Sequence, residues 1–70
     1  MNERMYEFWK ENVVKCLKRK KKPIYWRELA KEMGVKDTTL FRWLTLLEIR
    51  GVVKTVIGSD RKKYIELVRE

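Results

Sequence analysis

The sequence predicts a mainly helical α+β fold in which three helices precede a C-terminal β-hairpin. Three observations support this class: a 3.6-residue apolar repeat near the start, two further helical segments that each end at a glycine, and two β-forming runs around a short turn. A chain of 70 residues is expected to form one small domain, because its core is too small to divide.

The first helix is expected over residues 1–20, its regular part from residue 3, with Asn2 as N-cap and with Pro23 preventing continuation. Four apolar residues spaced by three or four positions form its inward face: Met5, Trp9, Val13 and Cys16. Cys16 is the single cysteine, so we expect it in the core. Because histidine is also absent, the sequence excludes an internal disulfide and a cysteine-based zinc site.

The middle of the chain predicts two helices joined by a tight turn. Residues 23–26 favour a brief strand or an extended link, and a second helix is expected over 26–33. Gly34 suits the left-handed conformation that ends a helix. A third helix is expected over 38–50, with Asp37 as N-cap or an alternative start at Lys36.

The C-terminal part predicts a hairpin with a basic tip. Residues 52–58 are rich in valine and isoleucine, residues 58–61 have turn composition, and residues 62–68 alternate apolar with polar side chains. The hairpin therefore spans residues 52–68, directly after the third helix.

The order of these elements resembles a winged helix-turn-helix domain of small archaeal and bacterial transcription regulators. The matching stretches are "ELAKEMGV", "TTLFRWLTLLEIRGVV" and the hairpin strand "KKYIELV". The resemblance implies a positioning helix, a recognition helix that enters the DNA major groove, and a wing on the flanking backbone or minor groove. It implies sequence-specific binding of double-stranded DNA, and we expect neither a cofactor nor a small-molecule ligand.

The third helix has distinct faces when its residues are placed 100° apart. Leu40, Leu44 and Leu47 form the inward face, and Trp43 at its edge is expected to pack. The opposite face carries the expected base contacts, which are Thr38, Arg42 and Thr45, with Phe41 beside them as a partner for a thymine methyl. The alternative is that the threonines are only first-turn residues and that Arg42 is only a solvated charge.

Phosphate contacts are expected from several cations. Lys36 and Thr39 lie near the start of the third helix, where free N–H groups suit an anion. The wing carries Arg61, Lys62 and Lys63, which reach a phosphate or the minor groove, unless this tip is merely a soluble turn. Lys20 and Lys21 belong to a basic run at the end of the first helix, which contacts phosphate or only caps the helix.

Four apolar residues, Phe8, Val14, Leu46 and Ile49, are not used by the expected core. Clustered exposed apolar groups mark interfaces, so we expect a homodimer through the first helix with Phe8 and Val14 in contact. The alternatives are that these residues are scattered singly or that the N-terminus covers them. A related hypothesis makes the domain a protein-interaction module of a replication or transcription complex.

The composition narrows the function class. Lysine and arginine number 18 against 10 acidic residues, a net charge of +8, which indicates an anionic partner and favours nucleic acid, specific or not. The sequence holds no pair of residues suited to general acid/base catalysis, so we do not expect an enzyme. The longest uncharged run is too short to span a bilayer, so a cytoplasmic, nucleoid-associated protein is expected. Abundant glutamate and lysine without glutamine is typical of thermophiles.

Overall fold

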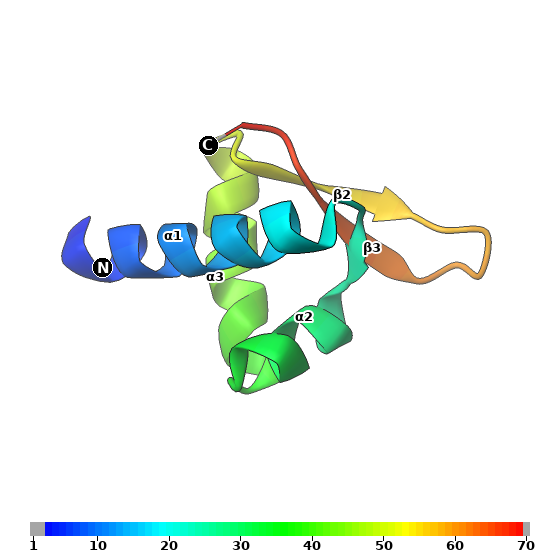
Figure 1. Cartoon of the computed structure of the whole chain (residues 1–70), viewed down its shortest axis with the longest axis horizontal. Helices are drawn as coiled ribbons and strands as arrows, with labels where there is room; N and C mark the ends of the chain where they lie inside the picture. Colours follow the sequence, from blue (N-terminus) through cyan, green and yellow to red (C-terminus); the bar gives the residue numbers. More distant parts are fainter. Residues whose placement is uncertain (1–2, 70) are drawn as a thin grey trace.

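The computed structural model of the protein describes residues 3–69 (Figure 1). The described elements are, in order, α1 (Glu3–Lys20), β1 (Ile24–Tyr25), α2 (Trp26–Met33), α3 (Asp37–Ile49), β2 (Val53–Ile57) and β3 (Lys63–Leu67). This confirms the mainly helical α+β class with a C-terminal hairpin. Asn2, the expected N-cap of α1, lies outside the described residues.

α1 is buried along a wider arc than its apolar repeat predicts, because α2 and α3 pack against one part of it and β3 against another. Val14, which we expected outside the core, is only 9% exposed and belongs to the core cluster. The expectation that Val14 lies outside the core is therefore wrong, while its expected dimer contact stays a prediction. Met5, which we expected on the inward face of α1, is instead 48% exposed, because the first turns of α1 project beyond α3 (Figure 1).

The turn between α2 and α3 depends on Gly34, which ends α2 in the left-handed region with φ 68°. Its N–H donates to the Lys31 carbonyl at 3.1 Å, and the Val35 N–H donates to the Ala30 carbonyl at 3.0 Å. Two carbonyls that the end of α2 would leave free thus have partners. This pair of bonds turns the chain sharply and brings the start of α3 close to α2.

α3 begins one residue earlier than its predicted range, at Asp37. Lys36 is the N-cap residue, so the alternative start is confirmed and the assignment of Asp37 as N-cap is wrong. Asp37 occupies the first turn, where a carboxylate is favourable to the helix dipole, and its Oδ2 lies 3.7 Å from Arg27 Nε. The ion pair links the starts of the two helices, which explains why Asp37 serves better inside the turn than before it.

Gly51 ends α3 in the same manner and directs the chain into the hairpin. Its φ is 76°, its N–H donates to the Glu48 carbonyl at 3.0 Å, and the next N–H, of Val52, donates to the Leu47 carbonyl at 2.9 Å. β2 and β3 then pair antiparallel, with Val53 opposite Leu67. The hairpin therefore starts directly at the C-terminal end of α3.

β1 extends this hairpin to a three-stranded sheet with the order β1-β3-β2. Ile24 pairs with Ile65, and Tyr25 pairs with Tyr64. Because side chains alternate across a strand, the two buried isoleucines face the core and the two tyrosines face the opposite side. The sheet thus has one face packed against the helices and one face turned away from them.

The core lies where the three helices and the base of the sheet meet, and two tryptophan rings connect α1 to α3 within it. The rings of Trp9 and Trp43 stack with centroids 5.4 Å apart and planes at 12°, which confirms the packing role expected for Trp43. Cys16 is buried as expected. Leu46 is half-buried and packs against the core, so its expected place outside the core is also wrong. Ile49, by contrast, is 76% exposed.

Candidate nucleic-acid interface

The outward face of α3 carries the three residues expected to contact base edges. Thr38, Arg42 and Thr45 are all exposed, and Arg42 forms no ion pair with any residue between 3 and 69. The Thr45 hydroxyl donates to the Phe41 carbonyl at 3.0 Å, so its proton is already used within the helix. Thr45 is therefore available to DNA as an acceptor and as a methyl group, not as a donor.

The first turn of α3 offers backbone N–H groups beside a cation. Lys36 and Thr39 are exposed there, and the intrahelical ladder begins only at the Leu40 N–H, which donates to the Lys36 carbonyl at 3.0 Å. The earlier N–H groups point out of the helix end, where an anion is favoured. The pairing of Asp37 with Arg27 reduces the local negative charge that would otherwise oppose a phosphate.

Phe41 connects α3 to the wing instead of pointing straight outward. Its ring packs edge-on against Trp26 with centroids 5.6 Å apart, and Lys63 Nζ lies 5.5 Å from the ring centroid. The side chain remains 45% exposed, which leaves room for an apolar contact on the outward face of α3. Phe41 thus contacts both α2 and the wing, which its sequence position did not indicate.

The tip of the wing is a tight loop that places an arginine in an unfavourable backbone conformation. The Gly58 N–H donates to the Lys62 carbonyl and the Arg61 N–H donates to the Gly58 carbonyl, both at 2.9 Å. Arg61 has φ 65°, in the left-handed region where a turn of this kind usually has glycine. The Arg61 side chain is thereby presented at the extreme of an ordered loop.

Asp60 organises this loop from within. Its Oδ1 accepts the Lys62 N–H at 3.0 Å and its Oδ2 accepts the Tyr64 hydroxyl at 2.6 Å. These two bonds, with the tyrosine the stronger cause, hold the pKa of the Asp60 carboxyl below its ordinary value. The same bond raises the pKa of the Tyr64 hydroxyl. The wing tip is therefore ordered by a charged hydrogen bond and not by apolar packing.

The cations of the wing tip are not neutralised. Within residues 3–69, Arg61, Lys62 and Lys63 form no ion pair with a carboxylate, and all three are exposed. Farther down the hairpin, Lys54 Nζ pairs with Glu66 Oε2 at 3.0 Å. Positive charge on the wing is thus concentrated at the tip, where it can reach beyond the surface of α3.

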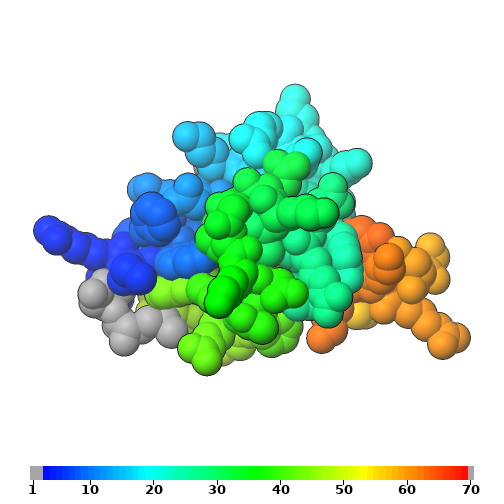
Figure 2. Space-filling view, turned by 90° about the horizontal axis from the view of Figure 1, so that it is seen from below, coloured from blue at the N-terminus to red at the C-terminus, as the bar shows by residue number. Residues whose placement is uncertain are grey.

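The basic run at the end of α1 lies away from α3 but beside strand β3 of the wing. Figure 2 shows the cyan end of α1 at the upper edge of the molecule, α3 in yellow-green toward the lower edge and the orange wing at the right. Lys20 is partly neutralised by Glu32, with Nζ to Oε1 at 3.2 Å, whereas Lys21 is exposed. The phosphate contacts expected of Lys20 and Lys21 stay predictions.

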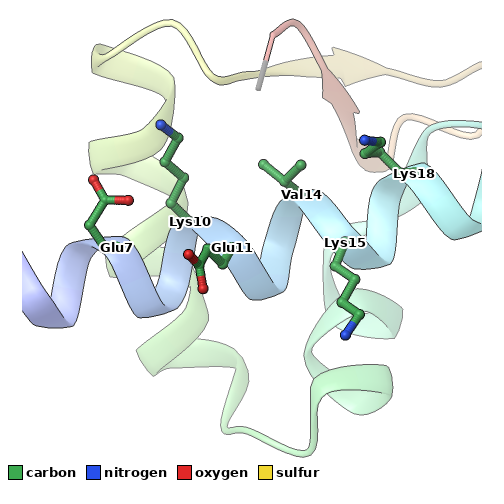
Figure 3. A pocket seen from close by; sticks show the side chains of 6 residues that line it. All are labelled: Glu7, Lys10, Glu11, Val14, Lys15 and Lys18. Carbon is green, nitrogen blue, oxygen red and sulfur yellow. The ribbon is translucent and has the colours of Figure 1, made fainter.

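A hollow of about 450 Å³ lies along α1 and is the site of no evident chemistry (Figure 3). Its lining comes from one helix only: Glu7, Lys10, Glu11, Val14, Lys15 and Lys18. Val14 points toward the side of α1 on which the strands lie, and Glu11 and Lys15 point the other way. No group of three or more possible metal ligands occurs within residues 3–69. Over the same residues, no helix combines the length and apolar character needed to cross a membrane.

Comparison of the chain with protein-family models, curated proteins and solved structures gave no match. What the structure itself establishes is a winged-helix-like topology, with three helices followed by an antiparallel hairpin. Function must therefore be argued from the residues of this surface.

Sequence reasoning missed the pair of tyrosines on the outer face of the sheet. Tyr25 and Tyr64 lie on neighbouring strands with ring centroids 6.0 Å apart, and Lys62 Nζ is 5.1 Å from the Tyr25 ring centroid. The signal in the sequence was the pair of motifs "PIYW" and "KKY", each with a tyrosine in a short β-forming run. Only the pairing of β1 with β3, which the sequence does not specify, brings them together.

Proposed function

We propose that the protein binds double-stranded DNA sequence-specifically, as a transcription regulator without enzymatic activity. α3 enters the major groove with Thr38, Arg42 and Thr45 toward the base edges. The wing tip places Arg61, Lys62 and Lys63 on the flanking backbone or in the minor groove. The observation that carries this proposal is a row of cations on α3 and the wing tip that have no carboxylate partner within residues 3–69. Phe41 of α3 connects the two groups, because its ring contacts Lys63 of the wing.

The roles differ along this surface. The Arg42 guanidinium provides a planar pair of donors that fits the O6 and N7 acceptors of guanine, so it carries sequence information. Lys36, Thr39 and the wing cations contact phosphate and set register. Because Thr45 presents an acceptor and a methyl group, it suits an amino group or a thymine methyl at the neighbouring base pair.

A selection from random duplexes followed by salt-titrated binding tests this function. A selected site should bind at least about 10³-fold more tightly than unrelated duplex, with an affinity that falls steeply as salt rises. Equal affinity for selected and unrelated duplex would identify a non-specific binder and contradict the proposal. A protein that binds no duplex at low salt would contradict it altogether.

A homodimer is part of this proposal, and it is supported by the 60% exposure of Phe8 on the projecting part of α1. A large exposed aromatic ring favours burial against a second copy, and a two-fold pair would present two α3 helices to half-sites about one helical turn apart. Sedimentation of the Phe8→Glu variant should give monomers. If that variant sediments as a dimer, Phe8 is not the contact.

A protein-interaction module is the second candidate, and the observation that favours it is Ile49, 76% exposed on the last turn of α3. A protein partner that covers the last turn of α3 would bury Ile49. If Ile49→Glu and Phe41→Ala abolish a protein complex while Arg42→Ala leaves duplex affinity unchanged, this candidate replaces the first.

A further inference from the structure

The outer face of the sheet carries two tyrosine rings that no helix covers. Tyr25 and Tyr64 pair across β1 and β3, their rings lie 6.0 Å apart at 51°, and both are only partly buried. Alternation along the strands turns them away from the core and from α3. This aromatic pair therefore belongs to a surface other than the candidate duplex interface.

Both rings are held in place before any ligand arrives. The Tyr64 hydroxyl donates to Asp60 at 2.6 Å, and its ring edge closes on Gly58, where an added Cβ would lie 2.7 Å from Tyr64 Cε1. Tyr25 carries Lys62 Nζ 5.1 Å from its ring centroid. Rings that are already ordered lose little conformational freedom when a flat group stacks on them.

The two rings border a hollow whose rim carries two lysines, one of them paired with Glu32, and one acid, Glu28. The hollow measures about 170 Å³, below the usual range for a drug-sized ligand, and is lined by Lys20, Lys22, Pro23, Ile24, Tyr25, Glu28 and Tyr64. Lys22 forms no ion pair with any residue between 3 and 69. In Figure 2 the cyan end of α1, the blue-green start of α2 and the orange wing adjoin along the right-hand side. The end of α1 and the wing thus place cations around two aromatic rings, and the start of α2 adds the acidic Glu28.

We propose that this face of the sheet binds single-stranded nucleic acid, with an unpaired base on Tyr25 and Tyr64 and the neighbouring phosphates at Lys22, Lys21 and Lys62. Aromatic faces within a basic groove are what single strands require, because their bases are free to stack on side chains. A duplex would use the cations but not the rings, since its bases are stacked inside the helix. The site uses no residue of α3, although it shares Lys62 with the wing tip, and it goes beyond duplex recognition.

The test is fluorescence anisotropy of the full chain with labelled oligothymidylate of about 12 nucleotides at low salt, and with the oligouridylate of equal length as the RNA arm. Tyr64→Leu and Tyr25→Leu should each weaken binding about fivefold to a hundredfold, the range measured for loss of one stacked base. Tyr25→Phe keeps the ring and removes a hydroxyl that forms no hydrogen bond within residues 3–69, so it should stay within about twofold of the wild type. Circular dichroism of each variant verifies that it is folded.

Lys22→Glu is the second variant, because residue 22 is exposed and its substitution leaves both rings in place. It should weaken single-strand binding and reduce the slope of log affinity against log salt by about 0.7 for each phosphate that the variant no longer neutralises. Arg42→Ala is the control for the other surface. It should leave single-strand affinity within about twofold, whether or not α3 proves to read duplex DNA.

Three results would overturn the inference. The first is a wild-type protein that does not bind either oligonucleotide at low salt. The second is a folded Tyr64→Leu or Tyr25→Leu variant with unchanged single-strand affinity. The third is an Arg42→Ala variant that loses single-strand and duplex binding together, since both ligands would then share α3. Failure of duplex selection with retained, tyrosine-dependent single-strand binding would instead contradict only the proposed function.

Discussion

The inward and outward faces of α3 differ sharply in how far their side chains are exposed. Leu40 and Leu47 on the inward face are 0% exposed, while Ile49 on the outward face is 76% exposed and Arg42 beside it has no ion-pair partner within residues 3–69. The inward residues hold the helix to the domain. The outward residues contribute little to folding, which leaves their identity free to be set by a partner.

The largest effect is expected on the inward face. Leu47→Ala removes a fully buried side chain and leaves a cavity in the core cluster, so it should lower the free energy of unfolding by about 2–5 kcal/mol. Urea denaturation measures this loss. Ile49→Ala is the matched control two positions along, and it should change stability by less than about 0.5 kcal/mol. Equal losses in the two variants would mean that the last turn of α3 is covered in solution.

The outward face should show the reverse pattern. Arg42→Ala should keep the stability of the wild type within about 0.5 kcal/mol, while it weakens binding to a selected duplex by about 1–3 kcal/mol and relaxes the preference at one base pair. Arg42→Lys keeps the charge but loses the two-pronged donor geometry, so it should recover affinity for unrelated duplex without recovering the preference. An Arg42→Ala variant with unaltered specificity would remove Arg42 from base recognition.

The division between these two faces was predictable from the sequence, and so were the helices. A 3.6-residue repeat determines which side of α3 is apolar, and the glycines at 34 and 51 end α2 and α3 through backbone conformations that other residues adopt at a cost. The hairpin was predictable for a similar reason, because β-branched runs around a turn have few alternatives. These are local signals that depend on neighbours in the sequence.

The structural features that the sequence did not predict depend on contacts between helices and strands that are distant in the chain. Val14 lies outside the apolar repeat of α1, yet β3 packs on that side and buries it. Asp37 has the composition of an N-cap, yet Arg27 on α2 offers a better partner inside the first turn. Tyr25 and Tyr64 are 39 positions apart and become neighbours only through the pairing of β1 with β3. Each of these outcomes is set by tertiary contact.

The wing tip extends the comparison to a site where a side chain that we propose to contact DNA opposes stability. Arg61 has φ 65° and Lys21 has φ 57°, a conformation that costs an L-residue about 1–2 kcal/mol, part of which glycine would regain. Arg61→Gly and Lys21→Gly should therefore each stabilise the protein, by up to about 1 kcal/mol in thermal denaturation. Only Arg61→Gly should reduce the salt slope of duplex binding, by about 1. A similar reduction in Lys21→Gly would place the end of α1 on the duplex after all.

The smallest effect is expected from the charged hydrogen bond inside the wing tip. The pKa of Asp60 is lowered in the folded protein, so its contribution to stability is present above the ordinary carboxyl pKa and is lost as pH falls through the lowered value. The pKa of Tyr64 is raised, so its contribution is present below the ordinary phenol pKa and is lost as pH rises through the raised value. Asp60→Asn keeps an acceptor for the Tyr64 hydroxyl but removes the charge. In an NMR titration, the pKa of Tyr64 should then fall toward its ordinary value while the rings of α3 and α1 keep their shifts, and an unchanged Tyr64 titration would show that Asp60 does not order the wing.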